Sequence, residues 1–258
     1  MRVALCFFGL VGSKTGKSLN KEGGTDEVLQ GCYESFKKHF LDKNNIDVFF
    51  HTWDKDFENE LVDKYNPKLY KTESQKVFTE IVPHNTPRVQ GHYSRWYSAK
   101  ISNDLKSKYE NENNFKYDFV MSSRFDMKWL TDVVFKNFDK DRFYIPRTTK
   151  DNKPWGWPNG WCNNEINDMW FFSNSENMDK FLKLYDNINQ YLSDGCPTFL
   201  GISNHMLTKW HLEKIGLMPE PKKGTKENYI SLGFDDSSDF QLYRNYIKSW
   251  YLREPENI

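Results

Sequence analysis

The fold is decided by residues 117–129, which read YDFVMSSRFDMKW. Residues 119–121 within this stretch are apolar and rich in aromatic and β-branched side chains, which predicts a short buried strand. Two serines follow, and then come Arg124 and Asp126. Side chains two positions apart in a strand project to the same face. This guanidinium and this carboxylate are therefore expected to lie together at the carboxyl end of the strand.

The Arg124–Asp126 pair predicts a site for a diphosphate and a metal ion. In an open α/β sheet, ligands bind beside the carboxyl ends of the strands. A carboxylate at that place can hold a hard divalent cation, whose other ligands are waters and phosphate oxygens, and a guanidinium suits a phosphate. The alternative is a surface ion pair, which adds little to stability. The position directly after a central strand favours the ligand site.

The composition is typical of a soluble globular protein. The chain has 258 residues, enough to bury a substantial core. Its 36 Lys and Arg balance its 36 Asp and Glu, so no overall charge attracts nucleic acid or an anionic membrane. Aromatic residues make up 17% of the sequence, which argues against disorder. We find no apolar run of membrane-spanning length, and we expect no nucleic-acid partner and no transmembrane segment.

The cysteines favour a reducing environment. Among Cys6, Cys32, Cys162 and Cys196 there is no Cys-x-x-Cys pair, which predicts neither a zinc site nor a disulfide framework. A cytoplasmic, intracellular location is the corresponding expectation. Residues 2–11 have the charge and length of a signal-peptide core, but no small-residue cleavage site follows them. We therefore interpret them as a buried first strand.

Strands and helices are expected to alternate along the chain, which predicts an α/β fold with a mixed, mostly parallel central sheet flanked by helices in a single domain. The expected strands are residues 3–8, 46–50, 68–71, 119–121, 142–146, 169–172 and 229–232. The expected helices are residues 26–41, 56–65, 92–109, 175–192, 197–215 and 240–251, with a short helix or turn at 131–138. The helix at 92–109 is predicted from the helical spacing of Tyr93, Trp96, Tyr97, Ile101 and Leu105.

Two more groups of candidate ligand-binding residues lie at the end of the second strand and in the first turns of the third helix. Thr52 and Trp53 stand at the carboxyl end of the second strand, where they would form a shelf for a base or a sugar. The alternative is that Asp54 is a capping residue and Trp53 packs in the core. Tyr97 and Lys100 lie in the first turns of the helix and are candidates to reach the same site. The alternative for both is a solvated helix face.

A glycine-rich segment, residues 9–24, follows the first strand and is expected to form a loop. It contains GSKTGKS at residues 12–18, which resembles a phosphate-binding P-loop. That motif needs four residues between its glycines, and here there are three. We do not interpret the segment as a P-loop, although the loop that Gly9 begins can still approach a nucleotide. A nucleotide-dependent kinase or sulfotransferase that uses residues 12–18 is the first alternative function.

Three tryptophans lie among glycines and prolines in KPWGWPNGW, residues 153–161, which cannot form regular structure. Trp155, Trp157 and Trp161 would present a stacking surface for sugar rings, and we take them as candidate acceptor-binding residues. The alternative is a rigid hydrophobic plug under a lid. A non-catalytic glycan-binding module that uses these tryptophans is the second alternative function.

Two further titratable residues are candidates for chemistry. Asp168 precedes an apolar strand and is a candidate general base for a sugar hydroxyl. It is otherwise a turn aspartate that satisfies its own backbone. His205, in the helix expected at 197–215, is a candidate metal ligand in addition to Asp126. The alternative is an ordinary core or surface histidine.

Four stretches taken together resemble a known family, the small GT-A-fold glycosyltransferases of bacterial surface-polysaccharide clusters and large DNA viruses. The third stretch is the most specific, and the first is nearly generic. The resemblance extends to about residue 172, and the remainder is similar only as helices. The four stretches are RVALCFFG at residues 2–9, DVFFHTW at 47–53, YDFVMSSRFD at 117–126 and NDMWFF at 167–172.

The resemblance implies one GT-A-like domain, with a nucleotide-sugar-binding half at residues 1–130 and an acceptor-binding half at residues 131–258. It also implies the reaction, which is transfer of a sugar from a nucleoside-diphosphate sugar to a hydroxyl of a glycan or glycoconjugate acceptor.

The resemblance further implies roles for individual residues. In this family an Asp-x-Asp motif usually holds Mn²⁺ or Mg²⁺ and the donor diphosphate. Here Arg124 stands at the first acidic position, which leaves Asp126 as the carboxylate for the metal and lets the guanidinium neutralise part of the diphosphate charge. By the same analogy, Gly9 and Trp53 lie near the nucleotide and Asp168 lies near the acceptor.

Overall fold

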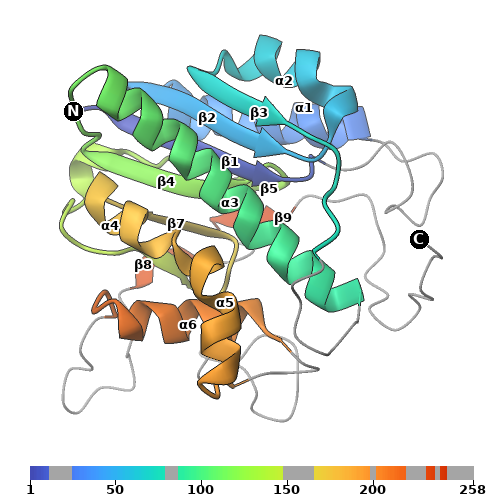
Figure 1. The fold of residues 1–258 in the computed structure, drawn as a ribbon. Helices are drawn as coiled ribbons and strands as arrows, with labels where there is room; N and C mark the ends of the chain where they lie inside the picture. Colours follow the sequence, from blue (N-terminus) through green and yellow to red (C-terminus); the bar gives the residue numbers. More distant parts are fainter. Residues whose placement is uncertain are drawn as a thin grey trace.

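A five-stranded sheet forms the centre of the protein (Figure 1). The structure is a computed structural model that describes residues 1–11, 25–78, 87–147, 166–197, 202–218, 231–235 and 239–242. The strand order is β3-β2-β1-β4-β7, and β7 runs antiparallel to β4 while the other strands are parallel. An α/β fold with a mostly parallel sheet is thereby confirmed. The strands are β1 (Val3–Gly9), β2 (Ile46–Thr52), β3 (Leu69–Thr72), β4 (Phe119–Arg124) and β7 (Trp170–Ser173).

Helices flank this sheet, and two short strand pairs accompany it (Figure 1). None of the described helices combines the length and the apolar character needed to span a lipid bilayer. The helices are α1 (Thr25–Phe36), which continues as a π-helical turn at Lys37–Leu41, α2 (Glu58–Tyr65), α3 (Pro87–Glu112), α4 (Ser175–Phe181), α5 (Leu184–Ser193) and α6 (Asn204–Lys214), with 3₁₀ turns at Lys55–Phe57 and Phe135–Asn137. The pairs are β5 (Met127–Trp129) with antiparallel β9 (Phe240–Leu242), and β6 (Ile145–Arg147) with parallel β8 (Ser231–Asp235).

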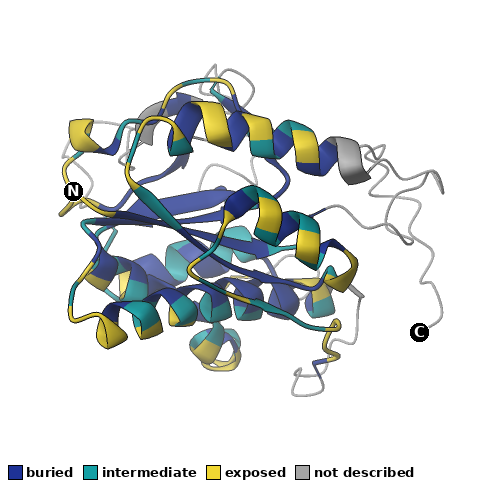
Figure 2. Ribbon diagram, turned by 90° about the horizontal axis from the view of Figure 1, so that it is seen from above, coloured by how far each residue is buried: buried dark blue, intermediate teal, exposed yellow. Residues whose placement is uncertain are grey.

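The two faces of the sheet contribute to two separate hydrophobic cores. On one face, Cys6 and Phe8 of β1 join the core that α3, α4, α5 and α6 cover. On the other face, Leu5 and Phe7 join the core that α1, α2 and β5 cover. This alternation is expected of a strand that is buried on both sides. Figure 2 shows β1 and β4 buried almost throughout and the helices exposed on their outer sides, whereas β3 at the edge of the sheet is only partly buried.

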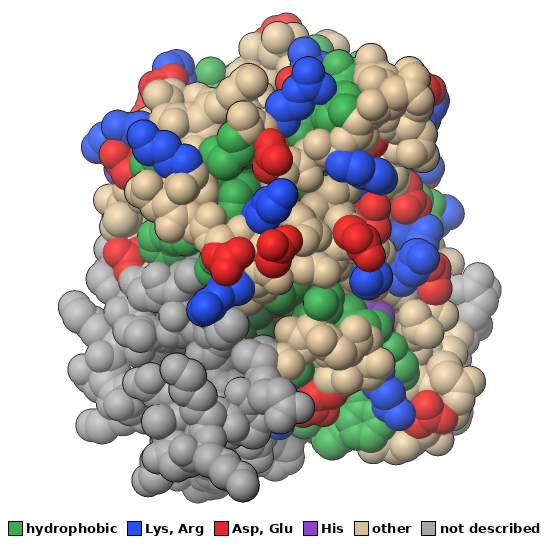
Figure 3. Space-filling model, turned by 90° about the vertical axis from the view of Figure 1, so that its left-hand side faces the viewer, with side chains coloured by type: hydrophobic (Ala, Val, Ile, Leu, Met, Phe, Trp, Pro, Cys, Tyr) green, Lys and Arg blue, Asp and Glu red, His purple; other side chains and the backbone are tan. Residues whose placement is uncertain are grey.

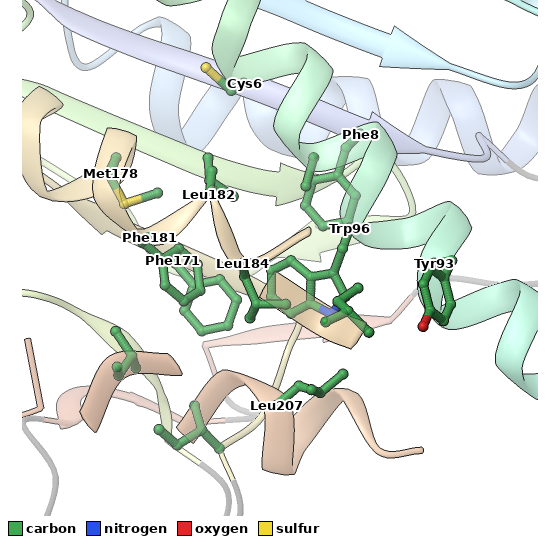
Figure 4. Close-up of a cluster of buried hydrophobic side chains, with 14 of the residues drawn as sticks. Cys6, Phe8, Tyr93, Trp96, Phe171, Met178, Phe181, Leu182, Leu184 and Leu207 are labelled. Atoms are coloured by element: carbon green, nitrogen blue, oxygen red, sulfur yellow. The ribbon is translucent and has the colours of Figure 1, made fainter. Parts of the chain in front are cut away.

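Trp96 of α3 lies in the middle of the first of these cores (Figure 4). The centre of its ring lies 5.8 Å from that of Phe181 in α4 and 6.4 Å from that of Phe171 in β7. Its indole N–H donates to Oδ1 of Asn204 at the start of α6, at 3.0 Å. One fully buried side chain therefore joins four elements of the fold.

α3 packs on the sheet partly through polar side chains, which its apolar pattern does not predict. Three of the five apolar residues that predict this helix are only partly buried, whereas Ser98 and Ser102 are fully buried. The hydroxyl of Ser98 lies 3.2 Å from the backbone oxygen and 2.7 Å from Nδ1 of His51 in β2, and Ser102 makes a longer contact of 3.5 Å to the backbone oxygen of Phe49. Hydroxyls can be buried in this way because they are hydrogen-bonded.

The helix predicted at residues 240–251 is wrong over its first residues. Residues 240–242 form β9 and pair with β5. The ring of Phe240 packs 5.4 Å from that of Trp129 and 5.7 Å from that of Trp170. This tertiary packing overrides the local propensity. Residues 243–251 lie outside the described residues.

Two other predicted helices differ from the helices in the structure. The helix predicted at residues 175–192 is divided into α4 and α5, and α5 packs against α3 and α6. The helix predicted at residues 197–215 begins at Asn204. Ser203 has an extended backbone there, and its hydroxyl accepts a hydrogen bond from the N–H of Met206. A cap of this kind defines the start of a helix.

Charges of both signs alternate on the face at the amino ends of the parallel strands (Figure 3). The backbone N–H of Arg2 donates to Oδ2 of Asp118 at 2.7 Å, and Nζ of Lys68 lies 3.4 Å from Oδ1 of Asp47. In the part of the chain that the structure describes, this face therefore offers no patch of a single sign.

A buried ion network anchors the carboxyl-terminal half of α3. Lys106 is fully buried, and its Nζ lies 2.7 Å from Asp179 of α4 and 3.1 Å from Glu110 one turn further along. The ammonium also donates to Oγ of Ser175 at 2.8 Å. Its three hydrogens thus have three acceptors. Burial alone would raise the pKa of Asp179, but Lys106 and the hydrogen bonds to Asp179 lower it.

The network predicts a stability difference between two lysines of the same helix. Lys106→Met is expected to lower the free energy of unfolding by about 3 kcal/mol, because Glu110 and Asp179 lose their buried cation and keep only the exposed Lys116. Lys108→Met is the matched control, since Lys108 is 62% exposed, and it is expected to change the free energy by less than about 0.5 kcal/mol. Urea denaturation followed by circular dichroism measures both. Equal effects would contradict a stabilising role for the network.

Candidate functional site

The carboxyl ends of β1, β2 and β4 meet at one edge of the sheet because these strands are parallel. The strand order reverses between β1 and β4, since β2 lies on one side of β1 and β4 lies on the other. Ligand sites of open α/β sheets form outside such a reversal. Gly9 and Arg124 end the two strands that flank it. Antiparallel β7 begins at the same edge, because its first residue, Trp170, pairs with Ser123.

Arg124 and Asp126 lie together at this edge, as expected. Strand alternation is not the reason, because β4 ends at Arg124 and Asp126 lies in the turn before β5. Nε and Nη2 of Arg124 donate to Oδ1 and Oδ2 of Asp126 at 2.7 and 2.8 Å, which makes a bidentate pair. The carboxylate side chain is 7% exposed and the guanidinium side chain is 25% exposed. Burial raises the pKa of Asp126, and the charge of Arg124 opposes that shift. The pair is therefore a largely buried one, in contrast to an ordinary surface ion pair.

A second guanidinium, which the sequence analysis missed, lies at the same edge. Nε of Arg95, on α3, lies 2.9 Å from Oδ2 of Asp168, and its Nη2 donates to the backbone oxygen of Asp168. Its Cζ lies 4.0 Å from the ring centre of Trp96 and 4.9 Å from that of Phe8, contacts that stabilise a buried cation. No local pattern marks this position, because only the packing of α3 across β1 brings it to the strand end.

Two guanidiniums and two carboxylates form one cluster here, which we call the charge cluster: Arg95, Arg124, Asp126 and Asp168. Burial lowers the pKa of Arg95 to about 10, the charge of Asp168 opposes the shift, and Arg124 adds to it. Each guanidinium therefore lies within electrostatic reach of the other.

The surroundings of Asp168 keep it ionised. Burial would raise its pKa, but Arg95, His205, Arg124 and His92 together lower the pKa well below its usual range. An ionised carboxylate accepts hydrogen bonds and holds cations, and it is a poor base while its pKa stays this low.

His205 lies near Asp168 and has one nitrogen engaged. Its Nδ1 lies 2.8 Å from the backbone oxygen of Ile166, so Nδ1 carries the proton and Nε2 the lone pair in the neutral ring. A metal ligand needs such a lone pair. Among the described residues, however, no group of three or more His, Cys, Asp and Glu side chains is placed to hold a metal ion. The structure thus does not join His205 and Asp126 in one such group.

Gly9 ends β1 with a φ of +92°, a conformation that favours glycine. Its N–H donates to Oγ of Ser98 at 2.8 Å, and this hydroxyl lies 2.7 Å from Nδ1 of buried His51. Nε2 of His51 lies 3.0 Å from Glu73, which pairs with Lys71 at 2.7 Å. A Cβ at Gly9 would meet no described atom within 4 Å. The end of β1 is therefore firmly held and still open to close approach by a ligand.

Thr52 and Asp54 shape the neighbouring turn. Oγ1 of Thr52, which is fully buried, accepts a hydrogen bond from the N–H of Asp54 at 3.0 Å. The carboxylate of Asp54 in turn accepts one from the N–H of Val11 at 2.6 Å. The carboxylate of Asp54 thus fixes the backbone just after β1, and the hydroxyl of Thr52 stabilises the turn just after β2.

Trp53 and Tyr97 stack on each other beside this turn. Their ring centres are 5.5 Å apart with an interplanar angle of 23°. Trp53 is 7% exposed, which accords with the core-packing interpretation, and Tyr97 is the more accessible of the two. Nζ of Lys76 lies 4.2 Å from the ring centre of Tyr97 and donates to its hydroxyl at 2.7 Å. Lys100 pairs with Asp104, one turn further along α3, at 2.8 Å.

Two predicted features lie outside the described residues. They are the glycine-rich sequence at residues 12–18 and the tryptophans Trp155, Trp157 and Trp161. Both remain predictions.

Comparison with known proteins assigns no function to this geometry. No protein-family model matches the chain, and no curated protein matches it significantly. The observations define an α/β protein with a charge cluster at the carboxyl edge of its sheet, and its function is inferred from that site.

The contacts of His51 predict a pH dependence of stability. Burial lowers the pKa of His51 to about 4; Glu73 opposes the shift, and Lys71 and Lys76 add to it. The unfolded chain takes up this proton near pH 6.5 and the folded protein near pH 4. The free energy of unfolding is therefore expected to fall as the pH is lowered through that window.

Thermal unfolding of the wild type and of His51→Gln, measured from about pH 7 to about pH 4, tests this expectation. The stability of the variant is expected to fall less than that of the wild type as the pH is lowered. The same slope in both proteins would contradict a neutral, buried His51.

Proposed function

We propose that this chain is a glycosyltransferase that moves a sugar from a nucleoside-diphosphate sugar to a hydroxyl of a glycan or glycoconjugate. The observation that carries the proposal is the charge cluster at the reversal of strand order. Open α/β sheets bind nucleotides at this place. Fixed cationic groups stabilise the negative charge that develops on a leaving diphosphate.

The topology supports a GT-A-like arrangement as part of the proposal. The parallel strands β3, β2, β1 and β4 belong to the nucleotide-sugar-binding half, residues 1–130. Antiparallel β7 brings Asp168 from the acceptor-binding half, residues 131–258, to the same edge. Donor and acceptor groups would then meet beside the carboxyl ends of β1 and β4.

In this proposal, different residues of the site bind different parts of the donor. Arg124 binds a phosphate oxygen, and the open backbone of Gly9 lets the diphosphate approach β1. Tyr97, which stacks on Trp53, would contact the base or sugar of the donor once the ammonium of Lys76 leaves its ring. Asp126 would hold Mg²⁺ or Mn²⁺, which supplies further neutralisation of the diphosphate.

The carboxylate of Asp126 fits such a cation, because one carboxylate with phosphate oxygens and waters is a sufficient ligand set for Mg²⁺. Both oxygens of Asp126 accept hydrogen bonds from Arg124 in this structure. Binding of a cation would therefore require Arg124 to turn from the carboxylate towards the phosphate. The guanidinium side chain is 25% exposed, so part of it already faces solvent.

Asp168 is proposed to receive the acceptor hydroxyl. It is ionised at neutral pH, since its pKa is lowered, and it can accept a hydrogen bond from a sugar hydroxyl. In an inverting reaction it would also take the proton of that hydroxyl, once its ion pair with Arg95 is loosened and its basicity rises. In a retaining reaction it would only orient the hydroxyl.

UDP- or GDP-sugars are expected to raise the Tm, because a ligand present at a hundred times its Kd stabilises the folded state by about 2.7 kcal/mol. Asp126→Ala is expected to abolish both this shift and donor turnover. Asp42→Ala, at an exposed aspartate paired with Lys37, is the matched control and is expected to retain both. A thermal-shift panel with and without Mn²⁺, together with an assay of nucleoside diphosphate release, measures these effects.

Other outcomes would favour another function. Unchanged stabilisation and turnover in Asp126→Ala would show the site assignment to be wrong. Stabilisation by ATP or a sulfonucleotide that is lost in Lys17→Ala would favour a kinase or sulfotransferase. Glycan binding without any nucleotide response would favour a non-catalytic glycan-binding module.

A further inference from the structure

Arg95 carries a buried N–H group for which the described residues provide no acceptor. The side chain is 8% exposed. Nη2 donates to the backbone oxygen of Asp168, and Nε makes an ion-pair contact of 2.9 Å with its carboxylate, although the geometry at Nε is not that of a hydrogen bond. Nη1 is buried and has no hydrogen-bond partner among the residues that the structure describes. Such unpaired groups are rare in folded proteins, and an unpaired one calls for an explanation.

The chemistry of the neighbourhood points to an anion as the partner of Nη1. Arg124 is close enough to lower the pKa of Arg95, so two like charges share one region. The side chain of Arg124 is 25% exposed, whereas Nη1 of Arg95 is buried, so a phosphate that enters beside Arg124 would have to displace neighbouring side chains to reach Nη1. Guanidiniums match the geometry of carboxylate and of phosphate oxygens, and they bind both through paired hydrogen bonds.

We propose that Arg95 and Arg124 together bind the phosphates of a nucleoside diphosphate, with Nη1 of Arg95 as a direct donor to a phosphate oxygen. This inference rests on the proposed function for the identity of the anion. It extends that function, because the charge of the leaving group is then met by two guanidiniums in addition to any cation held by Asp126. In this arrangement Asp168 is the counter-ion that holds Arg95 in position.

A structural role for Arg95 leads to a different expectation. As the counter-ion of Asp168 alone, Arg95 would affect the stability of the fold and leave anion affinity unchanged. The double variant Arg95→Gln/Asp168→Asn separates the two roles. It removes both charges together, so the net charge is conserved and no buried charge is left unpaired. A loss of affinity in this variant reports the loss of a direct donor.

Isothermal titration calorimetry of the full chain with inorganic pyrophosphate, UDP and GDP, in EDTA and in Mn²⁺, tests the inference. Arg95→Lys and the double variant are each expected to weaken pyrophosphate binding by about tenfold or more, because neither reproduces the donor Nη1. Lys108→Gln removes an exposed charge from the same helix and is the control. Its affinity is expected to stay within about twofold of the wild type.

The outcomes distinguish this inference from the proposed function. Wild-type pyrophosphate affinity in the double variant would overturn the inference, and turnover of a nucleotide sugar by the wild type would then leave the transferase proposal standing. Arg95-dependent binding of pyrophosphate without binding or turnover of any nucleotide sugar would support the phosphate site and overturn the transferase. A wild type that binds neither pyrophosphate, UDP nor GDP would overturn both.

Discussion

The site depends on one geometric constraint, which is that parallel strands end side by side. Gly9, Thr52 and Arg124 are far apart in the sequence, and they reach one edge because β1, β2 and β4 run in the same direction. β7 runs in the opposite direction, so its beginning lies at that edge. This is why Asp168 precedes its strand whereas Arg124 ends its own. The charge cluster therefore follows from strand direction and register before any ligand is considered.

α3 connects this edge to the rest of the fold, and its two buried cations differ in an informative way. Arg95 and Lys106 lie on the same side of the helix about three turns apart, roughly 16 Å. Lys106 has an acceptor for each of its hydrogens and joins α3 to α4. Arg95 is also buried, yet its Nη1 lacks an acceptor among the described residues. A fully satisfied charge is explained by the fold alone, whereas an incompletely satisfied charge suggests a ligand.

The charge cluster is balanced in this structure, because each guanidinium is paired with a carboxylate. Pairing lets charged side chains be buried at a tolerable cost and holds them in defined positions. In the proposal, a diphosphate that binds here would take Arg124 from Asp126, which would then be available to a cation. Arg95 would donate to the diphosphate through Nη1 while Asp168 holds it in position. The same four residues would thus serve both the ligand-free fold and the proposed reaction.

The sequence by itself determined the features that depend on short-range geometry. Continuous apolar runs predicted β1 and β2. The side chains of Arg124 and Asp126 meet as predicted, but through the turn that follows β4 and not through strand alternation. Alternation of strands with helices predicted the mostly parallel sheet.

Only the tertiary structure decided the pairing of Arg95 with Asp168, the burial of serines along α3 and the strand at residues 240–242. The physical reason is the range of the interactions involved. Periodicity records which way neighbouring side chains point, whereas the partner of a buried polar group is chosen by the packing of elements that are distant in the chain.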